Sequence, residues 1–145
     1  FQSQNENTMD TLILEPTENT PKIVLDHTKD LFEISGESRP EDVRKFYDPV
    51  LDWLEKFNAY LYWIGENNQE KKNIVFNFRF EYFNSSSAKY IMDIMTKLAE
   101  IQANCKNARI DISWNYDEPD EDMLEAGEEF KNITNLPFKF VPVTR

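Results

Sequence analysis

The part of the chain with the most potential for chemistry is a run of hydroxyl side chains from Asn84 to Ser87, between a strand pattern and a helix pattern. Asn and Ser side chains accept hydrogen bonds from the free N–H groups of a first helical turn, and the frequency of such N-caps favours this interpretation. A surface hydroxyl at such a junction is also open to a kinase, and a phosphate adds about −1.5 to −2 charges there. The run therefore predicts a cap or a phosphorylation switch at one of Ser85, Ser86 and Ser87.

A third interpretation makes Ser85 the nucleophile of a small hydrolase. It is disfavoured because the Gly-x-Ser-x-Gly elbow is missing and His27 is the only histidine, hence the only candidate base. The single cysteine, Cys105, and the single histidine also leave little for a zinc site or a Cys/His pair. Three glycines leave no Gly-rich phosphate loop. We therefore expect a non-enzymatic protein without a cofactor.

An acidic run from Asp117 to Asp122 resembles a cation site in composition, since hard cations prefer several oxygen ligands. Its spacing does not match an EF-hand loop, which also needs a central glycine. Acidic residues at a helix N-terminus simply favour the helix dipole, and this is the interpretation we adopt. No metal site is predicted.

The chain has 145 residues, with 16 Lys and Arg against 27 Asp and Glu, so its formal net charge is −11. This charge argues against nucleic-acid binding, which needs clustered Lys and Arg. No apolar run is long enough to span a membrane and no export signal is visible, so a cytoplasmic location is expected. Residues 1–8 are interpreted as a tag remnant or disordered, and residues 9–145 as one domain.

The first half of the domain contains two strand patterns and one helix. Short apolar pieces between Thr11 and Leu25 predict a strand or hairpin at a sheet edge. Residues 31–35 alternate as a strand that should end at Gly36. Ser38 and Glu41 have capping-box spacing and predict a helix to about Tyr62, broken at Pro49 with Asp48 as a second cap.

The second half alternates strands and helices. Residues 73–83 form a long strand pattern with one strongly apolar face, and the Ser run that follows begins a helix. Residues 109–114 alternate again as a strand, and Asp120 precedes another helix. Residues 137–143 predict a last strand. The order β-α-β-α-β-α-β predicts an α/β sandwich with a mixed sheet of about four to six strands and about three helices. Arg79 and Lys89 are candidate counter-charges or partner contacts, and Asn84, Ser86 and Ser87 are expected to fix the turn or contact a partner.

Three blocks of the sequence resemble the SiaC family of bacterial regulatory phosphoproteins. Residues 83–89 with Met92-Asp93-Ile94 resemble its Leu-Asn-Thr-Ser-Ser stretch and Met-Asp-Ile helix. Residues 50–57 resemble its Val-Ile-Asp-Trp-Val-Glu-Arg-Phe helix, and residues 114–117 and 128–130 resemble its Trp-His-Tyr-Asp and Glu-Glu-Phe. The resemblance runs from about Pro21 to Phe140 in the same order.

The resemblance implies a non-enzymatic switch that a dedicated kinase phosphorylates and a PP2C-type phosphatase dephosphorylates. The unmodified form would bind and activate a diguanylate cyclase, so the output would be cyclic di-GMP signalling. The family's phosphoacceptor is a threonine whose matching position here is Ser85, which keeps the hydroxyl and loses a methyl group. The layout also resembles STAS-type anti-sigma factor antagonists, in which a serine between a strand and a helix is phosphorylated, so an anti-sigma factor is the alternative partner.

Overall fold

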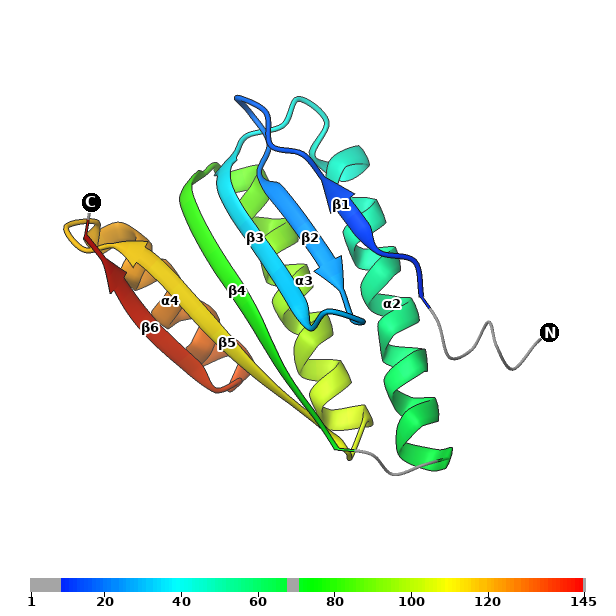
Figure 1. Ribbon diagram of the computed structural model, residues 1–145. Coiled ribbons are helices and arrows are strands. Elements are labelled where there is room, and N and C mark those ends of the chain that lie inside the picture. The colour runs from blue at the N-terminus through cyan, green and yellow to red at the C-terminus, as the bar shows by residue number, and fades with distance from the viewer. Residues whose placement is uncertain (1–8, 68–70, 145) are drawn as a thin grey trace.

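The computed structural model describes residues 9–67 and 71–144, in which six strands form one sheet with three helices (Figure 1). In chain order the elements are β1 (Leu12–Leu14), β2 (Lys22–Asp26), β3 (Leu31–Ser38), α2 (Val43–Asn67), β4 (Lys72–Phe83), α3 (Ser85–Asn104), β5 (Ala108–Asp117), α4 (Glu121–Thr134) and β6 (Phe138–Val143). The predicted α/β class, the mixed sheet and the three helices are confirmed. The expectation for residues 1–8 lies outside the described residues.

The strands follow one another across the sheet in the order of the sequence. β1, β2 and β3 are antiparallel neighbours and form the predicted N-terminal edge, whereas β3, β4, β5 and β6 run parallel. Each parallel step crosses over through a helix, and the three helices lie on one face of the sheet (Figure 1). The carboxyl ends of β3, β4, β5 and β6 therefore lie on one edge, where all three helices begin.

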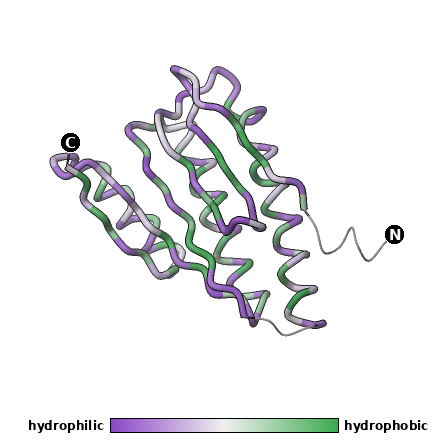
Figure 2. Tube along the Cα trace, in the orientation of Figure 1, coloured by the Kyte–Doolittle hydropathy of each residue, from purple (hydrophilic) through white to green (hydrophobic). Residues whose placement is uncertain are grey.

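The alternation in β4 explains this one-sided architecture. Ile74, Phe76, Phe78 and Phe80 point toward the helices and are buried, whereas Val75 on the opposite parity is 45% exposed. Apolar side chains of one parity on each central strand thus pack against apolar stripes of the helices. Hydrophobic residues concentrate in the strands and along the helices, while the turns at the ends of the sheet are mainly hydrophilic (Figure 2).

The structure corrects two expectations around the start of α2. β3 does not end at Gly36 but continues to Ser38 through a register shift between Gly36 and Glu37. Gly36 has φ +114°, which is accessible because glycine has no Cβ. Ser38 does not cap the helix, since it is the last residue of β3. The carboxylate of Asp42 does so instead, accepting a hydrogen bond from the N–H of Lys45 at 3.1 Å.

α2 is also longer and more continuous than predicted. Pro49 lies inside a single helix, and Asp48 starts no second one. The proline removes one backbone hydrogen bond, at a cost of about 3 kcal/mol, but Val50 and Leu54 are fully buried beyond it and hold the helix on the sheet. The helix extends past Tyr62 to Asn67 because Ile64 and Gly65 still pack inside.

Two helical glycines provide a matched test of this packing. A Cβ on Gly127 would lie 2.5 Å from Cδ1 and Nε1 of the buried Trp114, whereas a Cβ on Gly65 would meet nothing closer than 3.9 Å. We expect Gly127→Ala to destabilise the protein by about 1 to 3 kcal/mol through overpacking. Gly65→Ala should be neutral or stabilise by up to about 1 kcal/mol because alanine favours the helix.

The measurement is urea unfolding of both variants beside the wild type. Equal effects of the two substitutions would contradict the close approach of α4 to Trp114.

Candidate functional site

The turn from β4 to α3 is built around Asn84. This residue has extended backbone angles, φ −85° and ψ 175°, and its Oδ1 accepts a hydrogen bond from the N–H of Ser87 at 2.8 Å. Its carbonyl accepts the first helical bond, from the N–H of Ala88 at 2.9 Å. The predicted N-cap at the Ser run is thereby confirmed, and Asn84 fixes where α3 begins.

The same turn is held to the end of β3 by the backbone carbonyl of Ser38. This oxygen accepts one hydrogen bond from the N–H of Asn84 and one from the hydroxyl of Ser87, each at 3.0 Å. Both of its lone pairs are used, so the junction is bonded to a neighbouring strand as well as capped. Strand β3 therefore determines where the first turn of α3 lies.

A chain of three buried hydroxyls extends this attachment to α2. The Ser38 hydroxyl donates to the Ser87 Oγ at 2.8 Å and is 2.5 Å from the hydroxyl of Tyr47 on α2. Because each hydroxyl has one proton, the arrangement is satisfied when Tyr47 donates to Ser38, Ser38 to Ser87, and Ser87 to the Ser38 carbonyl. We call Ser38, Tyr47 and Ser87 the hydroxyl chain.

Burial makes the hydroxyl chain a neutral, structural element. Tyr47, Ser38 and Ser87 all have 0% exposure. Burial raises the pKa of Tyr47 to about 12, although its hydrogen-bonding interactions with the Ser38 and Ser87 side chains act to lower it. The hydroxyl of Ser87 is thus enclosed and already bonded, which separates it from its two neighbours.

Ser85 and Ser86, in contrast, are exposed on the first turn of α3. This turn carries no acidic residue, and Lys89 is exposed one turn later on the same face as Ser85. The other two helices that start at this edge are capped by carboxylates, Asp42 and Asp120. The first turn of α3 is therefore the helix N-terminus at this edge whose dipole is not offset by an acidic cap.

The second half of the acidic run, Asp120 to Asp122, has the structural role that was expected, whereas Asp117 ends β5. Oδ1 of Asp120 accepts from the N–H of Met123 at 3.1 Å and caps α4, with Glu121 and Asp122 in the first turn. Among the described residues, no group of three or more His, Cys, Asp or Glu side chains is placed to hold a metal ion. This half of the run belongs to the helix terminus.

Arg79 is directed to a different partner from the Ser run. Its guanidinium lies 2.9 Å from Oδ1 of Asp117 and links β4 to β5, with both side chains partly buried. Lys89 has no such neighbour among the ion pairs of residues 9–67 and 71–144. Of the two predicted counter-charges, only Lys89 lies on the helix that Ser85 begins.

The structure does not bring His27 to Ser85. His27 follows β2, beside the first residues of β3, whereas Ser85 lies beyond the last residue of β3, about 23 Å away along that strand. Its ring packs against Tyr60, and burial lowers the pKa of His27. Cys105 is buried and its pKa is raised to about 11 by desolvation, so its thiol is inert at neutral pH.

Sequence patterns did not identify Ser38 and Tyr47 as parts of this site. Ser38 had the spacing of a capping box, and Tyr47 lay on the apolar stripe of its helix. The available signal was chemical: a tyrosine on a buried stripe needs a partner for its hydroxyl, and a nearby serine can supply it. Only the packing of β3, α2 and α3 shows which serine does so.

Taken together, the fold and the site define a small α/β domain that presents exposed hydroxyls on a capped strand-to-helix turn. The family model described as "SiaC family regulatory phosphoprotein" matches residues 14–143, and the chain belongs to this family. An uncharacterized protein from Pseudomonas aeruginosa strain UCBPP-PA14 is 30% identical over 130 residues, covering 90% of this chain and 94% of that protein.

Solved structures agree with this assignment. Apo-SiaC from Pseudomonas aeruginosa matches with a TM-score of 0.75 and 28% identity, covering 92% of this chain and 99% of that one. SiaC also matches in a crystal structure of the diguanylate cyclase SiaD in complex with its activator SiaC, with a TM-score of 0.77, 28% identity and coverage of 91% and 99%. Among the described residues of this chain, no helix has the length and apolar composition needed to cross a bilayer.

The contrast between neighbouring serines leads to a stability prediction. Ser87→Ala leaves the buried Ser38 hydroxyl without its acceptor, so we expect a loss of about 1 to 3 kcal/mol in the free energy of unfolding. Ser85→Ala, the matched control on the same turn, should stay within about 0.5 kcal/mol of the wild type. Urea unfolding measures both, and a neutral Ser87→Ala would show that the hydroxyl chain does not support the turn.

The ionisation of Tyr47 gives a pH prediction. Its pKa is about 12 in the folded state against a reference of 10.0, so the neutral hydroxyl contributes stability that is complete below pH 10 and is lost as pH rises toward 12. Relative to Tyr47→Phe, the wild type should lose about 2 kcal/mol between pH 9 and 11.5.

Urea unfolding of both proteins across this range tests the prediction. The comparison cancels the titration of all other groups, so parallel stability curves would place Tyr47 outside the buried chain.

Proposed function

We propose that this protein is a phosphorylation-controlled binding module whose phosphoacceptor is Ser85 and whose unphosphorylated form binds and regulates a diguanylate cyclase. A protein kinase and a PP2C-type phosphatase would set the state of Ser85. The observation that carries the proposal is the exposed Ser85 hydroxyl on the anchored first turn of α3, in a chain of a regulatory phosphoprotein family. The relative SiaC, which shares this fold, is described as the activator of a diguanylate cyclase.

The environment of the three serines favours Ser85 over its alternates. Ser87 is enclosed and bonded in the hydroxyl chain, so a kinase would have to unfold the turn to reach it. Ser86 is exposed and remains the alternate acceptor. Ser85 lies four residues before Lys89, the spacing at which a phosphate and an ammonium group attract each other on a helix.

A phosphate at Ser85 is compatible with the folded domain but unfavourable in an interface with a bound partner. A negative charge in the first turn interacts favourably with the helix dipole, by about 0.3 to 1 kcal/mol, so the folded state tolerates it. Burying that charge against a partner surface without compensation costs several kcal/mol. Modification would thus release the partner and leave the domain itself intact.

The first experiment locates the modification. We expect intact-mass and peptide-mapping spectrometry of the protein from its own host to find a gain of about 80 Da on Ser85, from the mass of a phosphoryl group. Ser85→Ala should abolish it and Ser87→Ala should not. Absence of phosphate at Ser85 and Ser86 under all growth conditions would leave the run as a helix cap only.

The second experiment tests the consequence for binding. Phosphoserine encoded at position 85 should weaken binding to the host's purified diguanylate cyclase by about 100-fold or more and abolish its activation. Phosphoserine at position 96, an exposed site on the same helix, is the matched control and should have little effect.

Thermal unfolding of both modified proteins separates lost binding from lost folding. Equal binding by the two proteins would reject control by Ser85. If the unmodified protein binds an anti-sigma factor and no cyclase, the partner named in the proposal is wrong, whereas control by phosphorylation of Ser85 stands.

A further inference from the structure

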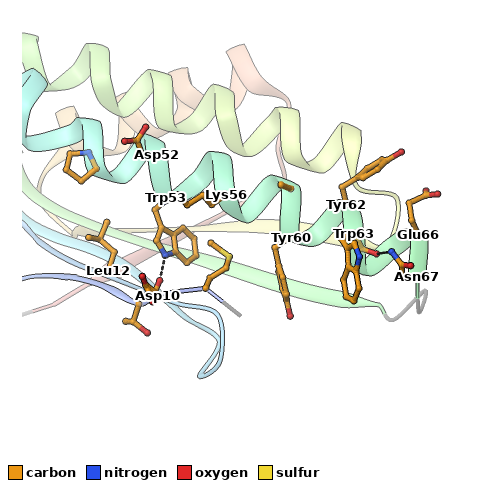
Figure 3. A pocket seen from close by; sticks show the side chains of 14 residues that line it. Asp10, Leu12, Asp52, Trp53, Lys56, Tyr60, Tyr62, Trp63, Glu66 and Asn67 are labelled. Atoms are coloured by element: carbon orange, nitrogen blue, oxygen red, sulfur yellow. Dashed lines mark hydrogen bonds between the residues drawn. The ribbon is translucent and has the colours of Figure 1, made fainter. Parts of the chain in front are cut away.

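A groove of about 940 Å³ runs along α2 on the side that the sheet does not cover. Its floor is formed by residues of this helix, which include the half-buried Tyr60 and Trp63 and also Trp53, which is 6% exposed and packs against the core, and its wall is the segment from Met9 to Leu12. The three rings project from α2 toward the same side (Figure 3). The indole N–H of Trp53 donates to the carbonyl of Asp10 at 2.8 Å and fixes the wall to the floor.

The groove exists because the sheet is shorter at this edge than the helix beneath it. α2 spans 25 residues, about 37 Å, whereas the edge strand β1 has three residues, about 10 Å. Within the described parts of the chain, β1 pairs with β2 alone, so its other edge has no neighbouring strand. Tyr60 and Trp63 lie on the part of α2 beyond Trp53, and both remain only half-buried.

The charges around the groove are mainly negative. Among the described residues that line it, Asp10, Asp52 and Glu66 are acidic and Lys56 is basic, and the whole chain carries a net charge of −11. The carboxylate of Glu66 forms an ion pair with the ammonium group of Lys106, at 3.7 Å. The side chains of Asp10 and Asp52 are exposed to solvent. An occupant with apolar side chains for the rings and basic side chains for the rim would match both features.

We propose that the groove binds an extended segment of a partner protein, in which apolar and basic residues alternate, as an added strand beside β1. A strand in this place would direct every second side chain onto the aromatic floor, chiefly Tyr60 and Trp63, and one end of its main chain would pair with the three residues of β1. The groove spans residues 49 to 67 of α2, about 27 Å, which accommodates about eight extended residues.

The aromatic part of this groove, around Tyr60 and Trp63, is separate from the Ser85 site, whereas its other end at Pro49 lies two residues after Tyr47 of the hydroxyl chain. Asn58, just before Tyr60, accepts a hydrogen bond from Asn104 in the last turn of α3, about 28 Å along the helix from Ser85. The proposal therefore goes beyond the proposed function, and its test does not involve Ser85. The two surfaces would let one chain contact two proteins or two parts of one protein.

The test uses the full chain and a phage-displayed library of random twelve-residue peptides. We expect the selected peptides to alternate apolar residues with Lys or Arg. Their affinity should fall at least tenfold in Trp63→Ala, and it should be unchanged in Tyr82→Ala, a matched control whose tyrosine is 49% exposed on β4.

The chain's three tryptophans provide a second readout. In nuclear magnetic resonance spectra, the indole N–H signals of Trp53 and Trp63 should shift on adding a selected peptide. That of Trp114, which is buried and donates to the Met123 carbonyl, should not. Circular dichroism verifies that Trp63→Ala is folded.

Three outcomes would overturn the proposal. The first is a selection that yields no binding peptides. The second is a set of selected peptides that are acidic, or that bind Trp63→Ala as tightly as the wild type. The third is self-association of the chain that Trp63→Ala abolishes. The last result would identify a second copy of this chain as the occupant.

Discussion

The backbone carbonyl of Ser38 is the point on which the arrangement of the candidate site depends. It accepts hydrogen bonds from the N–H of Asn84 and the hydroxyl of Ser87, so the end of β3 holds the first turn of α3 in place. Tyr47 extends the attachment to α2 through the Ser38 hydroxyl. These bonds join β3, α2 and the first turn of α3, so Ser85 is presented at a defined position.

The one-sided sheet restricts what kind of function this position can serve. α/β folds bind small ligands in the crevice where successive helices switch to opposite faces of the sheet. Here the order of β3 to β6 places every crossover helix on the same face, so no switch point exists among these strands. The carboxyl edge is therefore a surface on which the N-termini of the three helices lie side by side.

Charge distinguishes α3 from the other helices that begin at this edge. Asp42 and Asp120 cap α2 and α4 with carboxylates, whereas a neutral asparagine caps α3. A phosphate at α3 would supply the negative charge that the other two helices already have from their own residues. The groove on α2 depends on a different constraint, the shortness of β1, so the two surfaces can change independently.

Local periodicity in the sequence was sufficient for the order of elements, the apolar face of β4 and the N-cap at Asn84, because these features depend on neighbouring residues. Three adjacent serines look equivalent in sequence, yet one is enclosed and two are exposed, because α3 turns by about 100° per residue and its packing decides which side faces β3. Tertiary contacts likewise paired Arg79 with Asp117, removed Ser38 from the cap and carried α2 through Pro49. Each of these outcomes joins residues distant in the chain, and their relative free energies are set only when strands and helices pack together.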